Sequence, residues 1–100
     1  LAVDIAAQQG EAIKSVAAGT VLFADWTPDT GYVVIVQHQM GMISVYKHAL
    51  TVYKKWGDVV KKGEVIAAVG NTGELTTGPH LHFELWMDGS PVDPQQYIVF

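Results

Sequence analysis

Short apolar runs alternate with turn-forming residues along the whole chain. The clearest runs cover residues 32–37, 43–48, 65–69 and 80–87, and weaker ones cover 12–16 and 20–24. Val, Ile, Tyr and Phe are frequent in these runs, which is typical of strands. No stretch has the three-to-four-residue apolar spacing of an amphipathic helix. The pattern therefore predicts an all-β fold.

Turn signals separate these runs at short intervals. Turns are predicted at residues 8–11, 27–31, 40–41, 57–58 and 62–63, a loop over 71–79, and a hairpin at Asp88-Gly89. Residues 50–56 fit either an extended segment or a helical turn, and residues 91–94 are expected to lead to a β-prone tail that ends at Phe100. Turns at this spacing favour a compact antiparallel β-sandwich or barrel.

Composition narrows the class of protein. One hundred residues, 49% of them hydrophobic and 16% charged, predict one globular domain. A net charge of −4 without a basic cluster gives no reason to expect a nucleic-acid partner. The longest aliphatic stretch, residues 33–36, is far too short for a membrane span. The absence of cysteine excludes disulfides and thiolate metal sites.

The start of the chain indicates that more sequence precedes it. There is no initiating methionine and no signal peptide, and Leu1 already lies in what reads as a strand. We therefore expect a fragment of a longer protein whose N-terminus is missing.

Two histidines stand out in the strand predicted at residues 80–87. His80 and His82 are two positions apart, so they point to the same face, while Leu81, Phe83 and Leu85 point to the other. Two imidazoles on a rigid strand suit a metal, or a metal ligand beside a general base. The spacing alone is also common on the polar face of a half-buried strand.

The remaining chemistry is limited to a few residues. A catalytic zinc takes three protein ligands from His, Asp and Glu and leaves one position for water. Asp4, His48, His80 and His82 supply both kinds of ligand. His48 and His38 each end a predicted strand, and each is also explained by a structural hydrogen bond, His38 above all.

Several segments together resemble the lysostaphin-type, or LytM-like, zinc peptidases. The main signature is Asn71-Thr72-Gly73 followed by Gly78-Pro79-His80-Leu81-His82-Phe83-Glu84. Residues 3–7, 45–48, 57–63 and 89–94 agree with the same family. The resemblance implies a duplicated hybrid motif fold, a Zn²⁺ cofactor, and hydrolysis of peptide cross-bridges in bacterial peptidoglycan. It also implies a peptidase domain over residues 1–100, in the cell envelope, either periplasmic or extracellular.

The family motif assigns roles to individual positions. Asp4 and His82 match zinc ligands, and His80 matches the general base. His48 matches the histidine that assists the base and stabilises the oxyanion, whereas His38 receives no catalytic role. A weak repeat, V-x-x-G-x-V at residues 16–21 and 60–65, agrees with a duplicated motif or arises by chance.

One position departs from the family pattern. The first zinc ligand of the family is a histidine four residues before the aspartate. Leu1, Ala2 and Val3 precede Asp4 here, so the histidine position falls immediately upstream of Leu1. We expect a histidine there in the native protein, as the third ligand outside this chain.

Two other functional classes remain as alternatives. The first is a catalytically inactive domain of the same fold that binds or activates a cell-wall hydrolase. The second is a carrier or phosphotransfer module, because residues 57–66 also resemble biotinyl and lipoyl domains. No lysine in that segment has the setting of a modified hairpin lysine, which disfavours the carrier.

Overall fold

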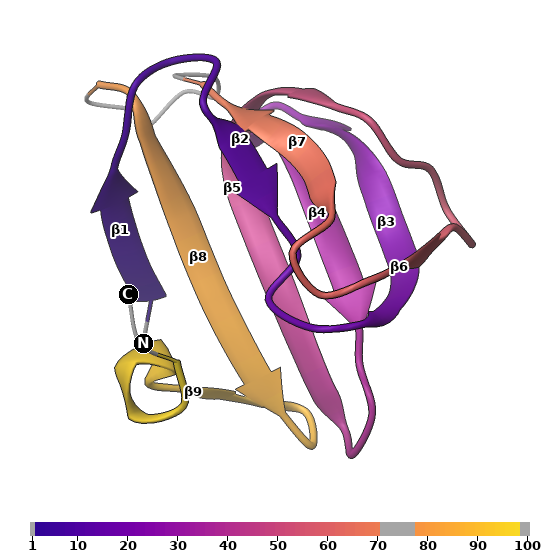
Figure 1. The fold of residues 1–100 in the computed structure, drawn as a ribbon. Helices are drawn as coiled ribbons and strands as arrows, with labels where there is room; N and C mark the ends of the chain where they lie inside the picture. Colours follow the sequence, from indigo (N-terminus) through magenta and orange to yellow (C-terminus); the bar gives the residue numbers. More distant parts are fainter. Residues whose placement is uncertain (1, 71–77, 99–100) are drawn as a thin grey trace.

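The structure, a computed structural model, describes residues 2–70 and 78–98, and within them it is an antiparallel β fold (Figure 1). The predicted all-β class is therefore confirmed. The strands are β1 (Ala2–Ala6), β2 (Ala12–Lys14), β3 (Gly19–Thr27), β4 (Gly31–Gln37), β5 (Met42–Val52), β6 (Val59–Val60), β7 (Val65–Val69), β8 (His80–Met87) and β9 (Ser90–Val92). A single 3-10 turn, η1 (Pro94–Gln96), follows them among the described residues.

The main sheet has the strand order β1-β8-β5-β4-β3-β6, and β9 pairs with the outer end of β8. The long strand β5 joins this sheet to a second layer. Its first part pairs with β4 and β8, and its last part, from Ala49 to Val52, pairs with β7, which in turn pairs with β2. In Figure 1, β2 and β7 accordingly lie across one face of the main sheet.

The hydrophobic core fills the space between the two layers. Its largest fully buried side chains include Tyr46 of β5 and Phe83 and Leu85 of β8. Alternation along β8 places Phe83 and Leu85 in the core and turns the intervening side chains to the opposite face. Each fully buried side chain of this size stabilises the fold by about 1.5–3 kcal/mol, so the core fixes the direction in which that polar face points.

Several element boundaries differ from those predicted. Strand β2 is shorter than the run 12–16, while β5 continues past His48 to Val52, so the first part of segment 50–56 is extended. Strand β3 begins at Gly19, where only glycine fits, because a Cβ would meet the Gln37 carbonyl oxygen and the His38 ring. The predicted strand over 65–69 and the Asp88-Gly89 hairpin are both confirmed.

The β-prone tail predicted after Pro94 is wrong at its start, because residues 94–96 form the 3-10 turn η1. Asp93 accepts a hydrogen bond from the Gln95 backbone N–H, and Pro94, with its fixed φ, begins the 3-10 turn. The predicted loop residues 71–77, together with residues 1, 99 and 100, lie outside the described part of the chain.

A buried chain of hydrogen bonds ties the 15–18 segment to β4 and β5. His38 Nδ1 donates to the Ala18 carbonyl (2.8 Å), so Nε2 accepts from the Ser44 hydroxyl (2.7 Å). Ser44 then accepts from the Tyr46 hydroxyl (2.8 Å), whose oxygen accepts the Val16 N–H (3.1 Å). His38 therefore has a structural role, as its sequence position favoured.

Among residues 2–70 and 78–98, the structure has no helix that is long and apolar enough to cross a membrane.

Candidate active site

Three neighbouring strands bring the four predicted site residues together. In the order β1-β8-β5, Asp4 is paired with His82, and His82 is paired on its other side with Lys47. The Asp4 Oδ1 atom lies 2.8 Å from His82 Nδ1 and 3.8 Å from His80 Nε2. The ring centre of His48 lies 5.3 Å from that of His80 and 5.9 Å from that of His82. The sequence thus predicted a set of residues that is contiguous in space.

His48 joins this cluster through an irregularity in β5. In an unbroken strand, residues 47 and 48 would point to opposite faces. His48 instead has a left-handed φ of +62°. The pairing of β5 shifts register against β4 between Tyr46 and Ala49, and against β7 between Ala49 and Thr51. Its backbone N–H donates to the Thr30 carbonyl (2.9 Å), in the turn between β3 and β4. The bulged backbone therefore turns the His48 ring toward the two histidines of β8.

The hydrogen bond of His80 defines which nitrogen is available for chemistry. Its Nδ1 lies 2.7 Å from the Gly78 carbonyl oxygen, which can only accept. Nδ1 therefore carries the proton, and in the neutral ring Nε2 has a free lone pair on the side of Asp4. This tautomer suits a proton acceptor at the site.

The two nitrogens of His82 face different carboxylates. Nδ1 faces Asp4, and Nε2 lies 2.9 Å from Glu84 Oε2. Both carboxylates can only accept, so in this structure Nε2–H donates to Glu84 and Nδ1–H donates to Asp4. A metal that replaced the Nδ1 proton would have Nδ1 and the Asp4 carboxylate as two neighbouring donors. A histidine ligand normally has such a carboxylate on its second nitrogen.

Glu84 is held on several sides. The Lys47 ammonium (2.7 Å) and His82 Nε2–H both donate to its Oε2, and the Trp86 indole N–H donates to Oε1 (3.0 Å). Burial raises the pKa of this carboxyl group, but the hydrogen bonds from Lys47, Trp86 and His82 outweigh it and lower the pKa to about 2. Glu84 is therefore an anion throughout the neutral range.

Sequence reasoning assigned no role to Glu84, Lys47 or Trp86. The signal for two of them was present, because alternation places residues 80, 82, 84 and 86 on one face of the strand. Lys47 could be found only from the register that sets β5 beside β8.

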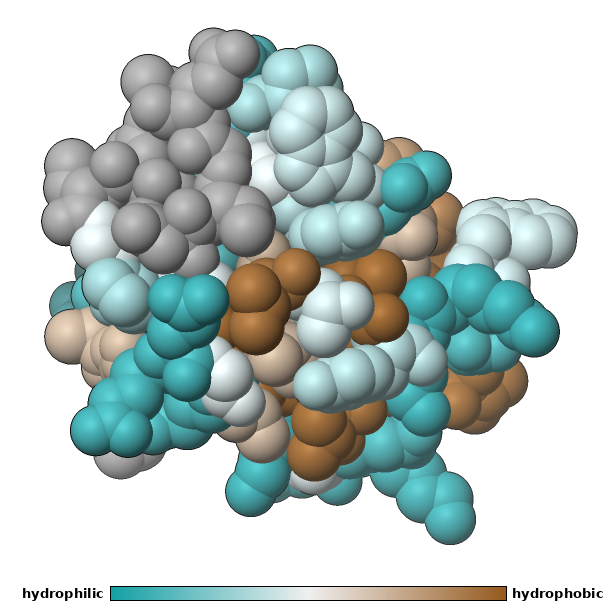
Figure 2. Space-filling view, turned by 90° about the horizontal axis from the view of Figure 1, so that it is seen from above, coloured by the Kyte–Doolittle hydropathy of each residue, from teal (hydrophilic) through white to brown (hydrophobic). Residues whose placement is uncertain are grey.

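A cavity of about 310 Å³ opens beside the cluster. It is lined by Asp4, Ala6, Gly78, Pro79 and His80. The view onto this end of the molecule shows hydrophobic residues in the middle of the face, with hydrophilic residues around them (Figure 2). A substrate group in this cavity would contact both Asp4 and His80.

The donor set agrees with zinc in kind. Zinc binds imidazole nitrogen and carboxylate oxygen, the two donor types that Asp4 and His82 present to each other. Residues 2–70 and 78–98 contain no group of three or more His, Cys, Asp or Glu side chains arranged to hold a metal. The described part of the site therefore supplies two donors.

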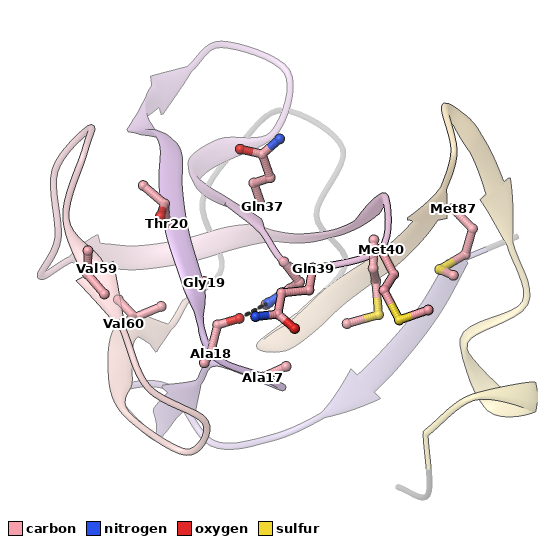
Figure 3. A pocket seen from close by; sticks show the side chains of 12 residues that line it. Ala17, Ala18, Gly19, Thr20, Gln37, Gln39, Met40, Val59, Val60 and Met87 are labelled. Atoms are coloured by element: carbon pink, nitrogen blue, oxygen red, sulfur yellow. Dashed lines mark hydrogen bonds between the residues drawn. The ribbon is translucent and has the colours of Figure 1, made fainter.

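A second hollow, of about 670 Å³, lies at the other end of the sheet (Figure 3). All three methionines of the chain line it, with Met40 and Met87 on one side and Val59 and Val60 on the other. The ring of His38 also lines it, but its nitrogens are taken up by Ala18 and Ser44. The hollow contains none of the four predicted site residues.

Comparison with known proteins identifies relatives of both enzymatic and regulatory kinds. The chain is 38% identical over 92 residues to the DD-carboxypeptidase/endopeptidase Mpg of Neisseria meningitidis serogroup B, a match that covers 92% of this chain and 21% of that protein. It is 36% identical over 94 residues to the murein hydrolase activator EnvC of Escherichia coli K12, covering 94% of this chain and 22% of that protein. The chain thus spans about a fifth of the length of these relatives.

Solved structures share the fold. A zinc containing peptidase from Vibrio cholerae superposes with a TM-score of 0.89 and 34% identity, over 97% of this chain and 30% of that one. The catalytic domain of the antimicrobial peptidase lysostaphin from Staphylococcus simulans gives a TM-score of 0.83 and 30% identity, over 94% of this chain and 74% of that one. The model of peptidase family M23 matches residues 1–94. As the lysostaphin-type signature of its sequence predicted, the chain belongs to peptidase family M23.

Proposed function

We propose that this chain is a zinc-dependent endopeptidase domain that hydrolyses peptide cross-bridges of bacterial peptidoglycan. The observation that carries the proposal is that four side chains from three different strands lie next to one another: Asp4, His48, His80 and His82. Membership of family M23 and the endopeptidase named among its relatives support the same reaction. Peptidoglycan peptides as partners imply a periplasmic or extracellular location.

Asp4 and His82 are the proposed zinc ligands among the described residues, and the third is expected upstream of Leu1. Zinc, when bound, supplies Lewis acidity that polarises a peptide carbonyl and lowers the pKa of a water molecule to about 7. The named zinc content of the Vibrio cholerae relative supports this choice of metal. Glu84 then accepts from the second nitrogen of His82 and leaves Nδ1 for the metal.

His80 is the proposed general base. Its Nδ1–H is held by the Gly78 carbonyl, so Nε2 is the nitrogen that accepts a proton from the attacking water. The same nitrogen then delivers this proton to the amine that leaves when the peptide bond breaks. Nε2 lies 3.8 Å from Asp4 Oδ1, so the proposed base is beside a proposed metal ligand.

His48 is the proposed partner of His80 and the stabiliser of the oxyanion. His48 is buried, with 7% of the residue exposed, and its ring lies against both other histidines. A buried N–H group aimed at a developing negative charge stabilises the transition state more than it would in water. Peptide hydrolysis develops such a charge on the carbonyl oxygen.

The alternative proposal is a catalytically inactive domain that binds or activates a cell-wall hydrolase. One observation favours it: a relative that covers 94% of this chain is named a murein hydrolase activator. The two proposals differ in whether the histidine cluster performs chemistry.

Two single substitutions, made in the longer native protein that includes the expected third ligand, test the roles. We expect His82→Ala to abolish zinc binding, because it removes a ligand nitrogen. His80→Ala should retain zinc while its activity on purified peptidoglycan falls by about two orders of magnitude, the range for a lost general base. Metal analysis and a digestion assay on both variants measure this, with Glu64→Gln as a matched control because Glu64 pairs with Lys54 away from the site.

Three outcomes would contradict the assignments. If both histidine variants lose zinc equally, the division between ligand and base is wrong. If His80→Ala keeps full activity, His80 is not the base. If the unaltered protein binds no zinc and digests no peptidoglycan but stimulates a separate wall hydrolase, the inactive-domain alternative replaces the enzyme.

A further inference from the structure

One polar face of β8 continues beyond the histidines. His82, Glu84 and Trp86 are successive side chains on this face, and Lys47 of β5 lies directly across from His82. The family motif assigned roles to no residue of β8 beyond His82. Glu84 therefore requires an explanation of its own, since a carboxylate with only 17% of its side chain exposed is costly unless its oxygens are bonded.

The contacts of Glu84 fix its orientation. Oε1 accepts from the Trp86 indole, and Oε2 accepts from both the Lys47 ammonium and His82 Nε2–H. Because each oxygen has at least one donor, and the donors come from both β5 and β8, the carboxylate cannot rotate freely. The oxygen that faces His82 is therefore held in place before any metal binds.

We propose that Glu84 is a positioning residue, which locks the His82 ring so that its Nδ1 faces Asp4. The inference rests on the proposed zinc site and adds to it. With Nε2–H committed to Glu84, Nδ1 is the nitrogen left for a metal once its own proton, which Asp4 Oδ1 accepts at 2.8 Å in this structure, is released. A carboxylate in this position also strengthens the ligand nitrogen as a donor.

Lys47 and Trp86 serve the same arrangement through Glu84. Without the carboxylate, the Lys47 ammonium would lie opposite His82 with no anion between them. A cation there would repel a divalent metal. Glu84 thus neutralises Lys47 and orients His82 with the same oxygen, while Trp86 holds the other oxygen.

The test measures zinc affinity, without relying on activity. Zinc is titrated, in competition with a chromophoric chelator, into the longer native protein that includes the ligand expected upstream of Leu1, and into variants of it. We expect Glu84→Ala to bind zinc about 10–100-fold more weakly, the usual effect of losing such a partner. Glu84→Gln retains an oxygen that accepts from His82 Nε2–H and should recover part of this loss. Glu64→Gln, which breaks a separate Lys–Glu pair, should bind zinc as the parent does.

A spectroscopic readout separates positioning from general destabilisation. Long-range ¹H–¹⁵N spectra of the histidine rings should show His82 with its proton on Nε2 in the zinc-loaded parent protein. In Glu84→Ala loaded with zinc in the same way, they should show a second population of His82 rings with the proton on Nδ1. Circular dichroism checks that each variant is folded, and Trp86→Phe, which removes one donor to Glu84 and keeps an aromatic ring, provides a milder second variant that should also weaken zinc binding.

The outcomes are distinguishable from those of the proposed function. If the parent protein binds zinc and folded Glu84→Ala binds it equally well with an unchanged His82 tautomer, the positioning role is refuted and the zinc site stands. If the parent protein itself binds no zinc, the proposed function fails first. A loss of affinity in Glu84→Ala that Glu84→Gln partly restores supports the inference.

Discussion

Tyr46→Phe tests the buried hydrogen-bond chain that joins the two layers. Tyr46 is 1% exposed, and its hydroxyl donates to Ser44 and accepts the Val16 N–H. Phenylalanine retains the ring and its packing against Phe83, whose ring centre lies 5.3 Å away. The substitution therefore removes one hydroxyl group and leaves the apolar core in place.

The expected loss of stability follows from the two hydrogen bonds of the Tyr46 hydroxyl. The Val16 N–H loses its partner, at about 1–3 kcal/mol for a poorly hydrated donor, and Ser44 loses one bond but keeps the one to His38. We expect the free energy of unfolding to fall by about 2–3 kcal/mol. For a domain of this size, that lowers Tm by roughly 10–20 °C.

Urea denaturation followed by tryptophan fluorescence measures this change, with Tyr53→Phe as the control. Tyr53 is 58% exposed, so its variant should stay within about 0.5 kcal/mol of the parent protein. If Tyr46→Phe is equally neutral, the hydroxyl does not hold the layers together, and the reasoning is refuted.

The stability of the same variant should also depend on alkaline pH differently from that of the parent protein. Burial raises the pKa of Tyr46 above its ordinary value of 10.0, because the phenolate would lie in the core. Above pH 10 the unfolded chain therefore releases a proton that the folded protein retains, and stability falls as pH rises, by at most about 1.4 kcal/mol per pH unit. Tyr46→Phe should remove this part of the pH dependence, and identical alkaline slopes would contradict it.

Two further predictions concern the stability of the protein in acid and the effect of substituting two glycines. The pKa of Glu84 is about 2 in the folded protein against 4.5 in the unfolded chain, so its stabilisation is complete above pH 4.5 and disappears as pH falls toward 2. After allowance for solvent, this should amount to about 1–2 kcal/mol in acid unfolding curves, and Glu84→Gln should flatten them. Gly70→Ala should destabilise strongly, because a Cβ would meet the Ala49 and Leu50 backbone, whereas Gly10→Ala, with open space around it but φ of +91°, should cost only about 1 kcal/mol by urea titration. Equal losses in the two glycine variants would contradict the close approach at Gly70.

The sequence by itself determined the fold class and most of the strands. Apolar residues that recur between Gly, Pro and Asn turns cannot bury their side chains in a single helix face, and they therefore favour strands packed in layers. The same local rule placed His80 and His82 on one face of β8, since side-chain direction has a period of two residues in any strand. The sequence did not predict the 3-10 turn at residues 94–96, because the cap at Asp93 and the fixed φ of Pro94 override β propensity.

Only the tertiary structure decided how the site is assembled. The register of β1 against β8 sets Asp4 beside His82 across 78 positions of sequence, and no local pattern encodes that pairing. The left-handed backbone at His48 turns its ring to the face that a regular strand would assign to Lys47. These features arise from pairings between distant strands, whose energies depend on the whole packed sheet. The residue types of the candidate site were therefore visible in the sequence, whereas their contacts, and the position of Lys47 beside Glu84, required the folded chain.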